Sequence, residues 1–72
     1  MSEMSDPYAA RPAFKAGDRV EVSDGREWDT GKVIRAYRVQ DGSGRLLWVY
    51  DVRMDFDAST PMKGVAYLRG AK

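Results

Sequence analysis

The chain has 72 residues, enough for one small domain, and it contains neither cysteine nor histidine. Disulfides and thiolate metal sites are therefore excluded, and the commonest metal ligand and general base of proteins is missing. Twelve Lys and Arg against eleven Asp and Glu leave a net charge of +1, whereas a domain that coats phosphates usually carries a larger basic excess. We therefore predict no cofactor and no metal, and we expect that the chain is not an enzyme.

Residues 1–13 are predicted as a flexible N-terminal arm. They show no hydrophobic periodicity, and Pro7 and Pro12 disfavour a helix. The alternative is an arm that docks on a partner through Tyr8 and Phe14. No basic segment followed by an apolar core marks a signal peptide, and no run approaches the ~20 apolar residues that cross a bilayer, so a cytoplasmic location without membrane contact is expected.

From Phe14 onward, short apolar segments and tight turns predict an all-β domain over residues 14–72. Polar–apolar alternation, or enrichment in β-branched and aromatic residues, marks each segment. The predicted strands are 19–23, 32–39, 45–53 and 64–69. Residues 40–44 have hairpin chemistry, which predicts antiparallel pairing of the second and third strands. Residues 54–61 are polar and are predicted as a loop with at most a short strand.

Short strands without a helix favour a small barrel, because closing the sheet removes its edges. The core of this barrel is predicted from the apolar side chains of the strands and of the segment before them. The predicted core residues are Phe14, Val20, Val22, Val33, Ile34, Leu47, Val49, Val65 and Leu68.

Three segments carry a resemblance to a known group of domains. Phe14-Lys15-Ala16-Gly17-Asp18-Arg19-Val20, followed by Trp28 and Gly31-Lys32-Val33, resembles the opening of a Tudor or Agenet domain. Leu47-Trp48-Val49-Tyr50-Asp51 is similar to the third Tudor strand, and Val65-Ala66-Tyr67-Leu68-Arg69 is similar to the last. Over residues 14–69 the resemblance implies a five-stranded SH3-like barrel of the Tudor, Agenet or KOW kind.

The first half also resembles the plasmid-borne type II dihydrofolate reductases. The shared residues are Gly17, Asp18, Arg19, Val20, Gly25, Trp28, Gly31 and Tyr37. That family needs a Val-Gln-Ile-Tyr run before its final strand, and here the corresponding stretch is Ala58-Ser59-Thr60-Pro61-Met62. The resemblance therefore implies the fold and not the folate-binding activity.

The Tudor resemblance implies an aromatic-lined end of the barrel that holds a methylated lysine or arginine by cation–π attraction, strengthened by carboxylates. The predicted partner-binding residues are Trp28, Tyr50, Phe56, Asp51 and Asp55. Arg53 stands where a further aromatic residue is expected. The alternative is that Trp28 and Tyr50 only cover a small core.

A second set of residues surrounds the predicted hairpin and combines basic groups with aromatic rings, as nucleic-acid-binding surfaces do. This possible nucleic-acid-binding set is Arg35, Tyr37, Arg38, Arg45 and Trp48. A solvated face on which long Arg stems cover apolar surface has the same pattern.

The sequence thus favours a small non-enzymatic module that binds a protein or peptide through its aromatic end. The alternatives are a nucleic-acid-binding accessory protein that uses the Arg35–Arg45 hairpin, and a structural or assembly subunit of a phage that associates with its own copies. Arginine outnumbers lysine eight to four, a usage typical of GC-rich genomes such as those of actinobacteria and their phages.

Overall fold

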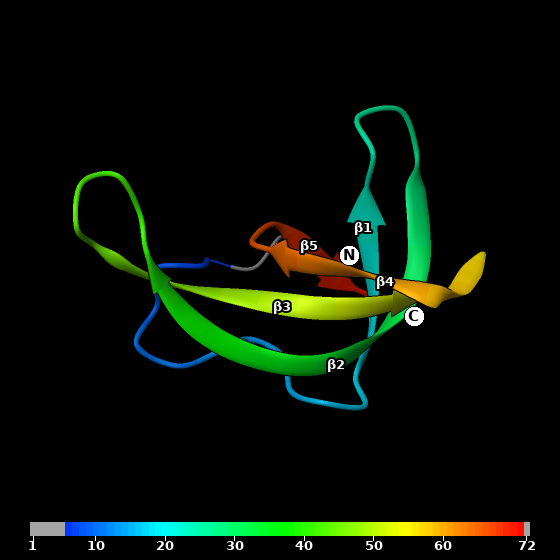
Figure 1. The fold of residues 1–72 in the computed structure, drawn as a ribbon, viewed down its shortest axis with the longest axis horizontal. Coiled ribbons are helices and arrows are strands. Elements are labelled where there is room, and N and C mark those ends of the chain that lie inside the picture. Colours follow the sequence, from blue (N-terminus) through cyan, green and yellow to red (C-terminus); the bar gives the residue numbers. More distant parts are fainter. Residues whose placement is uncertain (1–5, 72) are drawn as a thin grey trace.

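The computed structural model describes residues 6–71, which form one five-stranded antiparallel sheet (Figure 1). Its strands are β1 (Arg19–Ser23), β2 (Trp28–Gln40), β3 (Leu46–Met54), β4 (Asp57–Val65) and β5 (Leu68–Gly70). The strand order is β4-β3-β2-β1-β5, so β4 and β5 form the two edges. The all-β prediction is confirmed, as is the antiparallel pairing of β2 with β3, but the sheet is open rather than closed.

Among residues 6–71 there is no helix long and apolar enough to cross a membrane.

The stretch after β3 differs from the prediction of a loop. β4 runs over nine residues and pairs with β3, although its sequence is polar and contains Pro61. An edge strand tolerates proline, because one side of its backbone makes no ladder hydrogen bonds. The predicted strand at 64–69 is in fact divided between β4 and β5, with the break at Ala66 and Tyr67.

β2 is strongly bent, and an irregularity in its pairing with β3 lies in the bend (Figure 1). Val33 pairs with Val52, and the next paired residue, Arg35, lies opposite Asp51. Ile34 is therefore an extra residue, which is the definition of a β-bulge. The prediction of Ile34 as a core residue is wrong, since the bulge leaves its side chain 37% exposed.

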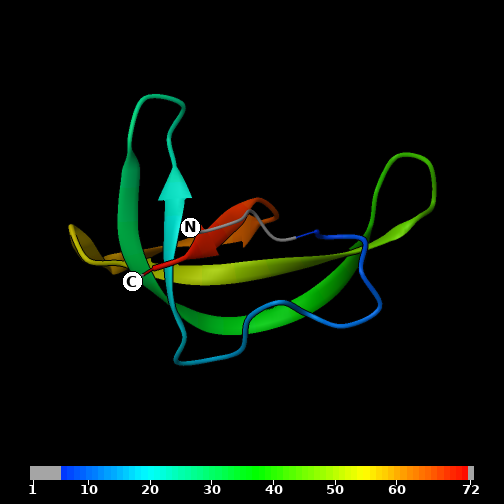
Figure 2. The same ribbon diagram turned by 180° about the vertical axis from the view of Figure 1, so that it is seen from behind.

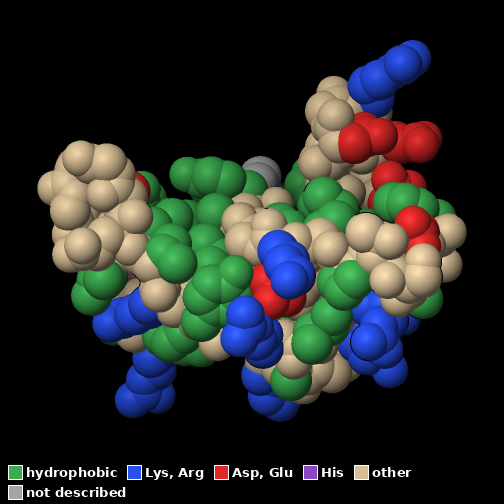
Figure 3. All heavy atoms as spheres, viewed as in Figure 1, with side chains coloured by type: hydrophobic (Ala, Val, Ile, Leu, Met, Phe, Trp, Pro, Cys, Tyr) green, Lys and Arg blue, Asp and Glu red, His purple; other side chains and the backbone are tan. Residues whose placement is uncertain are grey.

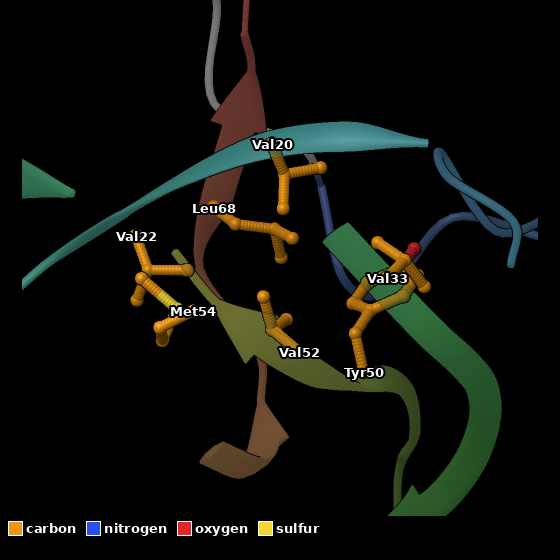
Figure 4. Close-up of a cluster of buried hydrophobic side chains, with 7 residues drawn as sticks. All are labelled: Val20, Val22, Val33, Tyr50, Val52, Met54 and Leu68. Atoms are coloured by element: carbon orange, nitrogen blue, oxygen red, sulfur yellow. The ribbon is translucent and has the colours of Figure 1, made fainter. Parts of the chain in front are cut away.

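The core lies on the concave side of the sheet (Figure 4). Its buried members are Val20, Val22, Val33, Tyr50, Val52, Met54 and Leu68. Four of these were predicted, and Phe14 and Val65 pack against the cluster as half-buried neighbours. Val49 is buried outside this cluster, and Leu47 is only half-buried. The sequence pattern missed Tyr50, Val52 and Met54, which alternate along β3 and point inward together.

The N-terminal segment from Asp6 to Ala13 lies along the β2–β3 hairpin (Figure 2). The backbone N–H of Trp48 donates to the carbonyl oxygen of Pro7 at 2.7 Å, and the N–H of Ala13 donates to the Tyr50 hydroxyl at 3.0 Å. This part of the chain is therefore hydrogen-bonded to the hairpin in the structure. The remainder of the predicted arm, residues 1–5, and residue 72 lie outside the described residues.

Candidate functional site

The register of β2 and β3 divides the side chains of the sheet between two faces. Directly opposite residues of an antiparallel pair share a face. Ala36 lies opposite the buried Tyr50, so both belong to the inner face that carries the core. The outer face carries the alternate residues of both strands, which pair as Lys32 with Arg53, Arg35 with Asp51, Tyr37 with Val49, and Val39 with Leu47.

Asp51 is a buried carboxylate on the outer face, with 5% of its surface exposed. Its oxygens accept hydrogen bonds from Arg35 Nε at 2.8 Å, from the Tyr37 hydroxyl at 3.0 Å and from the Gly64 N–H at 3.2 Å. Burial alone would raise the pKa of Asp51, but these three donors together outweigh it and hold the pKa below its usual value. The side chain thus joins β2, β3 and β4 as an ionised acceptor.

The two side-chain donors to Asp51 also contact each other. The Arg35 guanidinium lies 4.7 Å from the centre of the Tyr37 ring, a cation–π arrangement. The hydrogen bond to Asp51 raises the pKa of Tyr37 and that of Arg35 above their ordinary values. Both groups therefore keep their protons over the physiological range and hold the Asp51 charge in place.

The predicted aromatic end is not assembled as a cage around Tyr50. Tyr50 is buried on the inner face, where its ring packs edge-on against Phe14 with the centroids 5.8 Å apart. Asp51, its neighbour in the chain, projects from the opposite face because side chains alternate along a strand. Tyr50 and Asp51 therefore cannot face a common ligand. The position of Tyr50 agrees with the alternative interpretation, in which its ring packs on the core.

Trp28 lies on the outer face, and one of the chain's own cations already covers its ring. The Arg69 guanidinium stands 3.9 Å from the ring centre, and Arg69 Nε donates a 2.7 Å hydrogen bond to Glu21 Oε1. Arg69 and Glu21 lie opposite each other on β5 and β1. The position at which a methylated cation would stack on Trp28 is thus filled from within the chain.

The other two predicted members of the aromatic end lie in the turn between β3 and β4. Phe56 is 70% exposed there. Asp55 receives two hydrogen bonds from the Arg19 guanidinium, one of them 3.2 Å long between Nη1 and Oδ1. The Asp55 carboxylate is therefore also paired with a cation of the same chain.

The structure divides the predicted nucleic-acid-binding set between the two faces. Arg35 and Tyr37 lie on the outer face with Asp51, whereas Arg38 lies opposite Trp48 on the inner face. The Arg38 guanidinium stands 4.8 Å from the centre of the Trp48 ring, and its Nη2 donates to the carbonyl oxygen of Ala10 at 2.9 Å. The indole N–H of Trp48 is buried and has no acceptor among the described residues.

Arg45, the remaining member of that set, covers Tyr8 of the N-terminal segment with its guanidinium 4.3 Å from the ring centre. The Tyr8 hydroxyl donates a 2.8 Å hydrogen bond to Asp41 in the hairpin loop, which raises the pKa of Tyr8. Ser43 and Tyr8 both donate to Asp41 and hold its pKa well below its usual range. Arg45 and its neighbours therefore fasten the N-terminal segment to the hairpin.

Four arginines of the chain thus stack on four of its aromatic rings. The pairs are Arg35 with Tyr37, Arg38 with Trp48, Arg45 with Tyr8, and Arg69 with Trp28. Most of the aromatic residues that the sequence suggested for ligand binding are therefore occupied internally. In three of the four pairs the partners are ten or more residues apart in sequence, and only the tertiary structure brings them together.

An apolar strip lies on the outer face of the hairpin, where Val39 is exposed, Tyr37 and Leu47 are half-buried, and Val49 is buried. Tyr37 lies opposite Val49, and Val39 lies opposite Leu47, on the part of β2 and β3 that extends beyond β1 and β4. Val39 is 38% exposed. Figure 3 shows hydrophobic side chains gathered over this half of the sheet. We refer to Tyr37, Val39, Leu47 and Val49 as the hairpin strip.

The only acidic group of metal-binding geometry among residues 6–71 lies in and after the β1–β2 loop. One carboxylate oxygen from each of Asp24, Glu27 and Asp29 lies within 4.8 Å of the others. Asp24 Oδ1, however, accepts the backbone N–H groups of Glu27 and Arg26, which close the turn and lower the pKa of Asp24. The turn hydrogen bonds of Asp24 therefore explain why its carboxylate lies close to the other two.

Comparison with known proteins finds no matching family model, no matching curated protein and no matching solved structure.

Proposed function

We propose that this chain is a non-enzymatic binding module of the SH3-like kind, whose partner is a protein that lies on the hairpin strip. The observation that carries the proposal is the uneven cover of the β2–β3 hairpin. Its inner face is covered by the segment that begins at Asp6, through the Pro7 and Ala10 carbonyl groups. Its outer face carries the hairpin strip. Among residues 6–71, β1 pairs with β2 only up to Lys32, and β4 pairs with β3 only from Tyr50 onward, so neither strand lies beside the strip.

Apolar and aromatic side chains at the centre of a surface with few charges are typical of protein interfaces. The charged residues nearest the strip, Arg35 and Asp51, neutralise each other. A partner can therefore cover the strip without burying an unpaired charge, which would be costly. This favours a protein surface over a polyanion as the occupant.

The SH3-like assignment is supported by the strand order. β1 to β4 form a meander, and the short β5 returns to pair with β1, so the two ends of the sheet bend toward a common core. The proposal moves the binding surface from the predicted aromatic end to the hairpin, because Tyr50 is buried and Trp28 is covered by Arg69.

The test is a variant with Val39→Lys and Leu47→Lys together, which places two cations on the strip. Immobilised wild-type chain is incubated with nuclease-treated lysate of the source cells, and retained proteins are identified by mass spectrometry. We expect a specific protein that the double variant no longer retains. The matched control is Thr60→Lys on the exposed edge strand β4, which should retain that protein as the wild type does.

A protein retained equally by the wild type and the double variant would contradict the hairpin strip as the binding surface. A parallel capture from untreated lysate is the comparison, and a partner retained there but lost after nuclease treatment would replace the protein partner with a nucleic acid. Sedimentation equilibrium of the isolated chain tests whether a second copy occupies the strip. A mass well above 8.1 kDa for the wild type, together with 8.1 kDa for the double variant, would identify a second copy as the occupant.

A further inference from the structure

The outer face carries several charged residues in directly opposite positions on neighbouring strands. At two of these positions the charges are complementary. Glu21 of β1 lies opposite Arg69 of β5 and accepts its hydrogen bond, and Arg35 of β2 lies opposite Asp51 of β3 and donates to it. Opposite charges in this position stabilise a sheet, and like charges destabilise it.

At one end of the same face the pattern is reversed. Arg19 of β1 lies opposite Lys32 of β2, and Lys32 lies opposite Arg53 of β3. Three cations therefore stand in a row across three adjacent strands, which lie about 4.8 Å apart in a sheet. We call these residues the cation row.

Within the described range 6–71, only one carboxylate forms an ion pair with the cation row. Asp55 binds Arg19 through both of its oxygens. Lys32 and Arg53 have exposed side chains with neither an ion pair nor a hydrogen bond to any of the residues from 6 to 71. Lys32 and Arg53 thus have no counter-charge among the described residues. The acidic groups Glu21 and Asp51 on this face are paired with Arg69 and Arg35 instead.

The row borders a hollow of about 360 Å³ that is open to solvent. Its lining residues are Arg19, Lys32, Arg53, Met54, Asp55 and Ala58. The hollow has room for a bound oxyanion with its solvent, and ammonium and guanidinium groups together supply both a point charge and a planar pair of donors, which suits phosphate oxygens.

We propose that the cation row is a binding site for a phosphate group, held between Lys32 and Arg53. The bound phosphate supplies the negative charge that Lys32 and Arg53 lack in the folded chain. The site does not depend on the hairpin strip or on the proposed protein partner. The phosphate can belong to a small phosphate ester or to the backbone of a nucleic acid, since both present the same oxyanion to the row.

The first measurement titrates inorganic phosphate into ¹⁵N-labelled full-length chain, at constant ionic strength kept with sodium chloride. We expect saturable amide shifts centred on Lys32, Arg53 and their strand neighbours. The test variant is Lys32→Glu, which should weaken phosphate binding at least about tenfold, because it reverses the central charge of the row. The matched control is Arg26→Glu in the β1–β2 loop, at the other end of β1, which changes the net charge equally.

Lys32→Glu also places a carboxylate opposite both Arg19 and Arg53. Its melting temperature should therefore rise by about 2–10 °C, because two cross-strand charge pairs improve in a domain of this size. Loss of binding together with unchanged or increased stability separates a binding site from a structural role. Lys32→Gln, which removes the charge without reversing it, serves the same purpose if the glutamate variant does not fold.

The second measurement distinguishes the sources of the phosphate, using adenosine monophosphate and a single-stranded 12-mer oligonucleotide as probes. If the oligonucleotide binds more tightly than the mononucleotide and Lys32→Gln reduces its salt slope by about one, the source is a nucleic-acid backbone. If both bind with equal affinity at the row, the source is a small phosphate ester. The proposal is overturned if Lys32→Glu weakens phosphate binding no more than Arg26→Glu does, or if phosphate shifts no amide of the row.

Discussion

The hydroxyl group of Tyr37 donates a 3.0 Å hydrogen bond to the buried carboxylate of Asp51 on the neighbouring strand. The same carboxylate holds Arg35 and the backbone N–H of Gly64 on β4. Gly64 has a φ of +68°, a conformation that favours glycine, and this turns its N–H toward Asp51 at a register shift of β4. Asp51 is therefore the point at which three strands of the open sheet are joined by side-chain chemistry.

Asp51→Asn should lower the free energy of unfolding by about 1–3 kcal/mol, because the amide presents N–H groups to a position surrounded by donors. Urea denaturation followed by tryptophan fluorescence measures the change. The control is Asp29→Asn, whose carboxylate has no hydrogen bond among the described residues and lies near Asp24 and Glu27. It should change stability by less than about 0.5 kcal/mol, and an equal loss in both variants would contradict the role given to Asp51.

The stability of the chain should fall on acidification. The pKa values of Asp51, Asp41, Asp18 and Asp24 are all lowered in the folded chain. A carboxylate with a lowered folded pKa contributes fully above its unfolded pKa, near about 3.9, and its contribution disappears as the pH falls through the folded pKa. Urea midpoints should therefore be constant from about pH 7 to about pH 5 and decrease below that range.

Asp51→Asn provides the internal check on this pH dependence. Since it removes one of the groups with a lowered pKa, its urea midpoint should decrease less steeply below about pH 5 than that of the wild type. Parallel curves for the two proteins would show that Asp51 takes no part in the acid response.

Gly31→Ala should destabilise the fold where β2 pairs with the end of β3. A Cβ at this buried position would lie 2.8 Å from the Arg53 carbonyl oxygen, 2.8 Å from Val52 Cγ1 and 3.0 Å from Met54 Sδ. Overpacking of this kind lowers stability by about 1–3 kcal/mol, which thermal unfolding will show as a lower melting temperature. Gly42→Ala is the matched control, because nothing lies within 4 Å of its Cβ, and it should be neutral or slightly stabilising.

Deletion of residues 1–10 should destabilise the chain and expose Trp48. It removes the Pro7 carbonyl that accepts from the Trp48 N–H, the Ala10 carbonyl that accepts from Arg38, and the Tyr8 ring under Arg45. In a Trp28→Phe background, emission from Trp48 should move to longer wavelength, and the melting temperature should fall. Tyr8→Phe, which loses only the hydrogen bond to Asp41, should show a smaller decrease. An unchanged emission maximum after the deletion would mean that the segment does not cover Trp48.

Local chemistry determined much of the fold. The β-class, the positions of β1, β2 and β3, and the hairpin after Gln40 follow from alternation and turn residues, which are properties of neighbouring positions in the chain. Val20, Val22, Val33 and Leu68 were recognisable as core residues for the same reason. The nine-residue β4 was not, because its polar sequence becomes a strand only by pairing with β3.

Tertiary structure alone decided which side chains share a face. A strand has a side-chain period of two, so a single extra residue such as Ile34 exchanges the faces of everything that follows. That exchange places Arg35 and Tyr37 beside Asp51 and leaves Arg38 with Trp48 on the other side. The sequence by itself determined a small all-β chain rich in arginine and aromatic residues. The tertiary structure decided that four of its rings are covered by its own cations, and that Lys32 and Arg53 stand side by side with no ion pair to any other residue in the range 6–71.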